Sequence, residues 1–370
     1  MKNNLLPEQL ATLLQVALHP EREDRPSFVG AAGEDLYALA ARQGVLALAW
    51  DGLQILEREG LITAEQMPQR NLKLQWAYNV EQIEVRYEKQ RKTIAQLARF
   101  YTDHGIRMML LKGYGLSLCY PKPKHRPCGD IDIWLYGEQQ RADQLLSEKK
   151  GVKIRTDKHH HTIFHLNGIL VENHYDFFNV YAHPSNREIE RELQRLLVLK
   201  TGKEIEVEGI MCYLPSPNFN TLFLLRHAAA HFAAEKIGLR QVADWALFVK
   251  HYHSQIDWPW LVQLAERQNM HRFLHCLCAI GIDFLGMDPA WVPIFDRDES
   301  LERRVLQDIL TPEFSEKAER LGLIKSLYYK IRRWLANRWK HKIVYREGLI
   351  KTFLVQIWSH LLKPASLWQK

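Results

Sequence analysis

The chain has 370 residues, of which 46% are hydrophobic, 11% aromatic and 25% charged. This balance excludes a disordered, collagen-like or repeat-biased protein, and the length predicts two or three domains. The formal net charge is +7, and the excess lies in residues 325–370, which hold eleven Lys and Arg against one acid, Glu347. The body of the chain is therefore near neutral and its tail is strongly basic.

The cysteines and the apolar segments indicate where the protein resides. The five cysteines form no paired CxxC motif, so we expect free thiols in a reducing cytoplasm rather than disulfides or a structural zinc site. The N-terminal sequence MKNNLLPEQL has no basic region followed by a long apolar run, and we predict no signal peptide. The most apolar stretch, residues 349–362, is too short to cross a membrane and contains Lys351 and His360, so we predict no transmembrane segment.

Helices are predicted in the first part of the chain and a sheet in the middle. Leucines and alanines at helical spacing indicate an N-terminal helical region over residues 1–100, and residues 71–101 contain neither Gly nor Pro, which predicts one long helix. An α/β segment follows over residues 101–217. Alternation and turn residues predict strands at 106–111, 131–136 and 152–156, a helix at 138–149, and a hairpin of 162–166 and 169–178 turning at Asn167-Gly168.

Helical spacing returns after Pro217 and continues to the end. Residues 218–324 are predicted to form a helical domain, and residues 325–370 a set of basic, aromatic-rich helices. Within the helical domain we expect helices at 220–232, 239–252 and 260–285, followed by a loop over 283–300. The expected fold class is α+β, with a core of mixed sheet and helices between N- and C-terminal helical regions.

The segment GDIDIWL, residues 129–135, places two carboxylates on one strand. Alternate residues of a strand share a face, so Asp130 and Asp132 project together while Ile131 and Ile133 point to the core. Two adjacent carboxylates repel each other, and a hard cation such as Mg²⁺, which prefers oxygen ligands, relieves that repulsion. The alternative is a solvated strand face, because DxD sequences are common.

A third acid and a glycine turn favour the metal site. Glu172 lies on the predicted strand LVENH, with His174 on the same face, and a third carboxylate on a neighbouring strand would complete a site for phosphoryl transfer. Upstream, Lys112-Gly113 ends a strand at a turn into a helix, where backbone N–H groups can cradle a triphosphate. The loop basic residue Arg126 can meet phosphate oxygens in bidentate fashion.

These motifs resemble a known group of enzymes. The order of strand, glycine turn, helix, DxD strand and acidic strand is similar to the polymerase-β-like nucleotidyltransferase superfamily. More narrowly, LLKGYGLSLCYPKPKHRPCGDIDIWL and HHTIFHLNGILVENHYDF resemble the bacterial uncharacterised nucleotidyltransferase family, over roughly residues 80–250. The resemblance implies a polymerase-β-like core and transfer of a nucleoside monophosphate from an NTP, with ATP expected, to an unidentified acceptor hydroxyl or phosphate.

The resemblance also implies roles for individual residues. Asp130, Asp132 and Glu172 would be both the catalytic residues and the ligands of Mg²⁺ or Mn²⁺, with Glu172 placed to help activate the attacking hydroxyl. The nucleotide would be bound by Lys112, Gly113, Tyr114, Arg126 and Gly129. Tyr114 departs from the wider superfamily, which has Gly-Gly or Gly-Ser at this turn. Asp244 resembles a helix acid that follows the catalytic domain in these families, and the alternative is a buried acid with a hydrogen-bond partner.

Two groups of histidines in the sequence could form metal sites. His159, His160 and His161 are consecutive, and because neighbours on a strand alternate faces, we do not predict one zinc site from them, although one could lie at the substrate edge near Glu172. His227 and His231 form HAAAH, which lacks the Glu of the metalloprotease motif. They are expected to pack or to line the cleft.

The basic tail allows several interpretations. Residues 349–362 form an apolar helical stripe among cations and aromatic side chains, which fits a helix that closes the core. It also fits attachment to an anionic membrane surface at the inner face of the membrane, which we prefer over RNA binding. For the whole protein, the alternatives are a DxD metal-dependent glycosyltransferase and a non-catalytic nucleotide- or polyanion-binding module.

Overall fold

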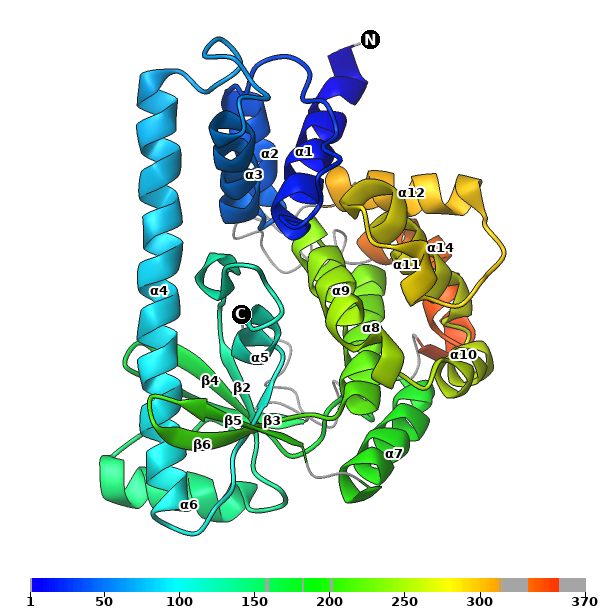
Figure 1. Cartoon of the computed structure of the whole chain (residues 1–370). Helices are drawn as coiled ribbons and strands as arrows, with labels where there is room; N and C mark the ends of the chain where they lie inside the picture. The colour runs from blue at the N-terminus through cyan, green and yellow to red at the C-terminus, as the bar shows by residue number, and fades with distance from the viewer. Residues whose placement is uncertain are drawn as a thin grey trace.

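The computed structural model describes residues 2–156, 160–181, 183–199, 202–312, 314 and 332–352. Its first helices are α1 (Lys2–Leu18), α2 (Glu34–Arg42), α3 (Leu46–Arg58) and α4 (Arg70–Thr102). The prediction of one long helix is confirmed by α4, which runs from the bundle of α1 to α3 at one end to the sheet at the other (Figure 1).

Six strands form one mixed sheet, in the order β3-β4-β2-β1-β6-β5. Adjacent strands are parallel in the pairs β4–β2 and β1–β6 and antiparallel in the others. The elements of this part are β1 (Met109–Leu111), α5 (Gly113–Ser117), β2 (Ile131–Trp134), α6 (Gln139–Lys150), β3 (His161–Leu166), β4 (Ile169–His174), α7 (Pro184–Leu199), β5 (Lys203–Val207) and β6 (Ile210–Leu214). The α+β fold class is thereby confirmed.

Turn chemistry explains which hairpin the sequence revealed. Asn167 and Gly168 have φ values of 52° and 69° and form the two-residue turn between β3 and β4, as predicted. The hairpin of β5 and β6 was not predicted. Its turn uses Glu208 and Gly209, with φ values of 53° and 75°, and Glu is an unusual residue at a left-handed position.

Three other predictions of local structure are wrong in whole or in part. Residues 152–156 form no strand, and Arg155 makes a single bridge with Ile163. The helix predicted at 260–285 is two helices, which meet at Asn269 in the left-handed conformation with φ 58°. The amide of Asn269 donates to the carbonyls of Lys342 and Tyr345, so a contact distant in sequence stabilises the break. The predicted loop over 283–300 also includes the short helix Pro289–Trp291 and the start of a longer one at Glu299.

The C-terminal part of the chain is helical. Its elements are α8 (Pro217–Ala234), α9 (Leu239–Tyr252), α10 (Trp258–Arg267), α11 (His271–Leu285), α12 (Glu299–Leu310) and α14 (Arg338–Val344). The predicted helices at 220–232 and 239–252 are confirmed by α8 and α9. No helix within the described residues is long and apolar enough to cross a membrane.

The two faces of the sheet belong to different hydrophobic cores. Ile131 and Ile133 of β2 lie in one core with the C-terminal half of α4 and with α6. Trp134 lies in the other, with Phe177, and this larger core continues through α8 and the N-terminal helices. Asp132 shares a strand face with Trp134 and lines a cavity together with residues of α8 and α9, so it projects to the side of the sheet that these helices cover.

Candidate active site

Three carboxylates meet where β2 and β4 lie side by side. The parallel register of these strands pairs Asp132 directly with Glu172, and Asp130 immediately precedes β2. Asp132 is buried, with 3% of its surface exposed, whereas Asp130 and Glu172 are half-buried. All three line a cavity of about 630 Å³ between the sheet and helices α8 and α9.

Lys112 balances the charge of Asp132. Its Nζ lies 2.9 Å from Asp132 Oδ1, and His174 Nε2 lies 3.0 Å from the same oxygen. Burial alone would raise the pKa of Asp132, but the Lys112 ammonium and the hydrogen bond with His174 outweigh burial and hold that pKa well below its ordinary value. Burial and the negative charge of Asp132 raise the pKa of Glu172. The two paired carboxylates thus differ in the ease with which they take up a proton.

The glycine turn after β1 has a strained backbone, of the kind that is concentrated at functional sites. Lys112 and Gly113 have φ values of 49° and 34°, and the former is rare for a residue with a side chain. Both line the cavity, as does Gly129. The predicted turn into a helix is present, and the helix that follows, α5, has five residues.

Tyr114 does not join this group. Its side chain is buried and stacks on Tyr87 of α4, with ring centroids 5.6 Å apart, in the core on the opposite side of the sheet from Asp132. Its side chain is not among those that line the cavity. A side-chain contact of Tyr114 with a nucleotide is therefore not proposed.

Arg126 is held by an acid from the helical domain. Its Nε and Nη2 donate to the two carboxylate oxygens of Asp244 on α9, at 2.7 and 2.8 Å, and the Tyr120 hydroxyl donates to Asp244 Oδ1 at 2.7 Å. All three side chains are buried. Arg126 lines the cavity, but its guanidinium N–H groups, which the sequence analysis assigned to phosphate, already donate to Asp244. The first role of Arg126 is therefore to join the DxD loop to α9.

A comparison with protein families agrees with this geometry. The model described as "Uncharacterised nucleotidyltransferase" matches residues 31–286, more than half of the chain. The chain belongs to this family. The match extends on both sides of the 80–250 segment that carries the sequence resemblance, so the family includes helices of the N-terminal and C-terminal regions together with the carboxylate strands.

Two further comparisons add little. Among solved structures, an antigenic nucleotidyltransferase-like protein from Paracoccidioides brasiliensis matches 44% of this chain and 77% of its own, with 15% sequence identity and a TM-score of 0.33. A similarity this low supports no statement about activity. A comparison with curated proteins found no match.

The fold brings more histidines to the cavity than the sequence predicted. His160, His161, His174, His183, His227 and His231 all line it. The cleft-lining role considered for His227 and His231 is what the structure shows, with their rings 4.5 Å apart. His159 lies outside the described residues. The sequence also allowed one of His159, His160 and His161 a place at the substrate edge, and strand alternation puts His174 on the face of Glu172.

Proposed function

We propose that this protein is a metal-dependent nucleotidyltransferase that moves a nucleoside monophosphate from an NTP, with ATP the expected donor, to an acceptor hydroxyl or phosphate. The observation that supports this most is the register of the sheet, which sets Asp132 directly beside Glu172 at the wall of a cavity. The chain's membership in a family named for nucleotidyl transfer points to the same chemistry. The placement of the core in the polymerase-β-like superfamily is part of this proposal.

The residues of the site fit a Mg²⁺ or Mn²⁺ ion. Asp130, Asp132 and Glu172 offer carboxylate oxygens, which these hard cations prefer, and Asp132 and Glu172 are like charges held close together. When bound there, such an ion would polarise the phosphate oxygens and neutralise the charge that develops on them.

The other cavity residues have separate tasks in this proposal. The acceptor oxygen attacks the α-phosphorus of the NTP, the bond to the β-phosphate oxygen breaks, and pyrophosphate leaves. Glu172 orients the acceptor hydroxyl and takes its proton. Lys112, at the strained turn on the cavity wall, contributes its ammonium group to the phosphates, and Gly113 and Gly129 let the nucleotide approach the backbone closely.

The alternative of a glycosyltransferase finds less support. It would usually have a nucleotide-binding α/β domain ahead of the DxD sequence. In this chain the described residues ahead of Asp130 are helical apart from turns and the three-residue strand β1. The alternative of a non-catalytic binding module is separated from the proposal by the experiment below.

The test is the transfer of label from the four α-labelled NTPs, with Mg²⁺ or Mn²⁺, to fractions of a cell extract. Asp132→Asn is expected to lower turnover by at least about 100-fold, because several kcal/mol of charge stabilisation is lost. Glu172→Gln is expected to lower turnover much more than nucleotide affinity, since Glu172 acts on the acceptor. The matched control is Glu148→Gln, an exposed acid on α6, which should leave turnover unchanged.

Near-wild-type turnover of Asp132→Asn would exclude this mechanism. If the wild-type chain binds NTP with Mg²⁺ but labels nothing, the binding module becomes the better description. Labelling from a UDP-sugar in place of an NTP would identify a glycosyltransferase instead.

A further inference from the structure

Three imidazole rings lie together on the cavity wall, beside the carboxylates. His161 begins β3 and His174 ends β4, and they are direct partners in the antiparallel register. Partners of this kind carry their side chains on the same face of the sheet. The ring centroids of His161 and His174 lie 5.1 Å apart, and that of His160 lies 4.2 Å from His161 and 5.7 Å from His174. We call these residues the histidine cluster.

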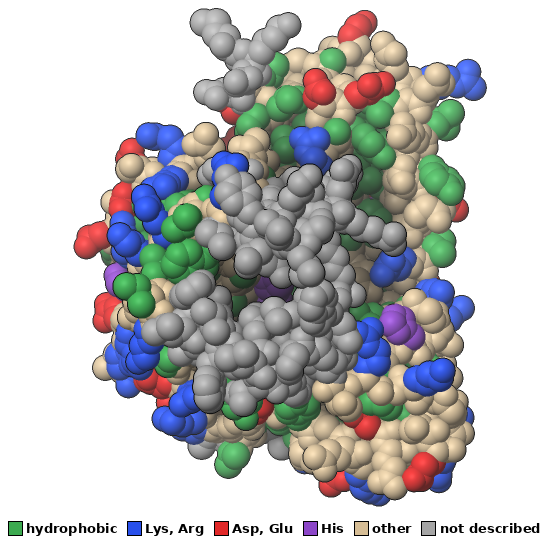
Figure 2. All heavy atoms as spheres, turned by 180° about the vertical axis from the view of Figure 1, so that it is seen from behind, with side chains coloured by type: hydrophobic (Ala, Val, Ile, Leu, Met, Phe, Trp, Pro, Cys, Tyr) green, Lys and Arg blue, Asp and Glu red, His purple; other side chains and the backbone are tan. Residues whose placement is uncertain are grey.

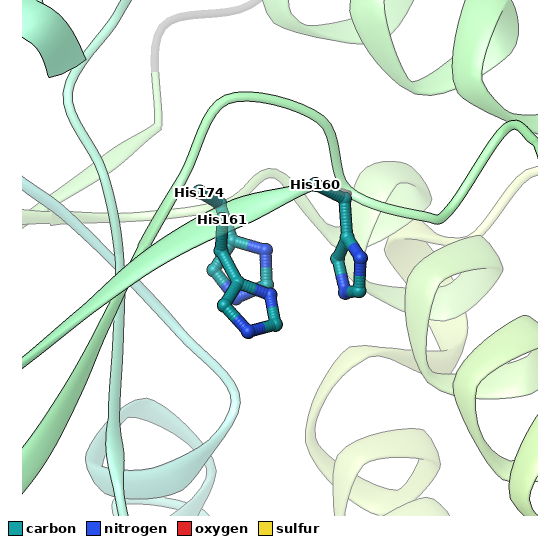
Figure 3. Close-up of side chains that lie close together, drawn as sticks. All are labelled: His160, His161 and His174. Carbon is teal, nitrogen blue, oxygen red and sulfur yellow. The ribbon is translucent and has the colours of Figure 1, made fainter. Parts of the chain in front are cut away.

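The backbone explains how His160 joins the cluster. His160 lies in a bend ahead of β3, so the alternation of side chains along a strand does not apply to it. Its carbonyl accepts hydrogen bonds from the N–H groups of Tyr175 and Asp176, at 3.0 and 3.1 Å, which tie it to the chain just beyond β4. Figure 3 shows that all three rings extend to the same side of the hairpin.

The nitrogens are close enough to share one ion. One ring nitrogen of each residue lies within 4.8 Å of those of the other two. Ligand nitrogens around a tetrahedral ion at about 2.1 Å lie about 3.3 Å apart, so the set closes with side-chain shifts of about 1 Å. His161 and His174 are buried, and the β3–β4 ladder holds their backbones in place.

The hydrogen bonds of His174 also favour an ion. Its Nδ1 lies 3.2 Å from the carbonyl oxygen of Asp176, which can only accept, so Nδ1 carries a hydrogen. Its Nε2 faces Asp132 Oδ1 at 3.0 Å and Glu172 Oε2 at 3.7 Å. An Nδ1–H bonded to a carbonyl, with Nε2 directed at the site, is the usual arrangement of a metal-ligating histidine.

We propose that His160, His161 and His174 bind one divalent first-row transition metal ion, with Zn²⁺ the best match. Imidazole nitrogens suit Zn²⁺ and its neighbours, whereas Mg²⁺ prefers oxygen ligands. The fourth ligand is Glu172, because its carboxylate oxygens lie 3.6 Å from His161 Nε2 and 3.7 Å from His174 Nε2. Three nitrogens and one oxygen are a common zinc set. This proposal does not rest on nucleotidyl transfer, since it concerns binding by the resting protein.

The test is calorimetric titration of the full-length, chelator-stripped protein with Zn²⁺ in the absence of Mg²⁺, because Glu172 is proposed as a ligand of either ion. We expect one Zn²⁺ per chain. His160→Gln and His161→Gln should each weaken Zn²⁺ binding by more than about 100-fold, because loss of a supporting partner of a ligand already costs about 10- to 100-fold. The matched control is His165→Gln, an exposed histidine on the same strand, which should bind Zn²⁺ as the wild type does.

X-ray absorption of the zinc-loaded wild-type protein tests the proposal without any variant. Multiple scattering from three imidazoles is expected, and a shell of oxygens alone would overturn the proposal. So would the absence of Zn²⁺ binding to the chelator-stripped protein, or an equal loss of affinity in His165→Gln. Asp130→Asn separates the two proposals, because it removes a carboxylate of the transfer site and should retain Zn²⁺ binding.

Discussion

The charged side chains around the cavity find their partners on elements that are distant in the sequence. Arg126 of the DxD loop pairs with Asp244 on α9, and Lys112, which follows β1, pairs with Asp132 on the neighbouring strand β2. Breaking a buried pair by removing one member commonly costs about 3–5 kcal/mol, because the other charge stays buried without compensation. Such pairs hold the loop, the sheet and the helical domain in one arrangement around the cavity.

Glu190 on α7 is another buried acid that shapes the cavity wall. One of its oxygens accepts from the backbone N–H groups of Phe177 and Phe178, at 2.9 and 3.1 Å, and both of these phenylalanines line the cavity. Burial raises the pKa of Glu190 from 4.5 to about 7, against the hydrogen bonds from Gln194 and the backbone.

This pKa predicts how stability depends on pH. Between pH 4.5 and about 7 the unfolded chain loses the proton of Glu190 before the folded protein does, so the free energy of unfolding falls as the pH rises. Glu190→Gln should therefore have a higher free energy of unfolding than the wild type at pH 8, by on the order of 1–3 kcal/mol, and this advantage should shrink at pH 5. Calorimetric unfolding at both pH values measures it.

The control for this prediction is Glu192→Gln, a less buried acid on the same helix that pairs with Arg195. It should change stability little at either pH, because exposed pairs contribute about 0–1 kcal/mol. An advantage of Glu190→Gln that is equal at both pH values would contradict the prediction.

At the scale of whole elements, α1 and α3 approach each other so closely that only glycine fits between them. A Cβ placed on Gly52 of α3 would overlap the backbone of Leu13 on α1. Leu13 and its neighbours in α1 are fully buried in the larger core. Helix propensity alone would favour Ala over Gly inside a helix by about 1 kcal/mol. Packing and propensity therefore predict changes in stability of opposite sign for Gly52→Ala.

We expect packing to decide the effect of Gly52→Ala. Backbone atoms cannot move aside cheaply, so the substitution should lower the free energy of unfolding by about 1–3 kcal/mol despite the better propensity. Urea unfolding of the full-length protein measures this. Gly33→Ser, at the N-cap of α2 with nothing within 4 Å of the added Cβ, serves as the control and should not lower stability, because Ser is at least as good an N-cap as Gly. A more stable Gly52→Ala protein would mean that the helices separate easily.

At the scale of the whole molecule, the described part of the basic tail belongs to the core. Val344 and Tyr345 are buried, and the Val344 carbonyl accepts from Nη1 of Arg226, a fully buried residue of α8, at 3.1 Å. Tyr345 stacks on His183, with ring centroids 3.8 Å apart, and both line the cavity. Lys340 is also buried and pairs with Asp308 at 2.6 Å.

Deletion of residues 332–370 should therefore destabilise the protein. It exposes core residues and leaves Arg226 without two of its contacts, so we expect insoluble protein or a clearly lower unfolding temperature. In the full-length chain, Tyr345→Ala should cost about 3–5 kcal/mol, as aromatic deletions in cores do, and Ile350→Ala, at a position 77% exposed, should cost little. A truncated chain that unfolds at the wild-type temperature would show that the tail is dispensable for the core.

The partner expected for the tail remains a prediction. Figure 2 shows Lys and Arg side chains spread over both sides of the rear face, mixed with acidic and hydrophobic ones. Of the apolar stripe over residues 349–362, only 349–352 lie within the described residues. The preference for an anionic membrane over RNA is therefore a prediction from the sequence alone.

The sequence by itself determined the local features of this protein. The long helix α4, the hairpin at Asn167-Gly168 and the shared face of Asp130 and Asp132 all follow from residue spacing and turn chemistry, which act over a few neighbours. The family motifs are likewise short stretches of the chain. The domain boundaries drawn from composition remain a prediction, and the larger core includes residues from all four regions.

Only the tertiary structure decided which residues meet. The pairing of β2 with β4 brings Asp132 to Glu172, and the position of α9 gives Arg126 its partner Asp244, although 118 residues separate the two. The pairing of β3 with β4 assembles the histidine cluster from His160 just before β3, His161 at its start and His174 at the end of β4. Contacts across such distances depend on how whole elements pack, and no local pattern in a single sequence specifies that packing.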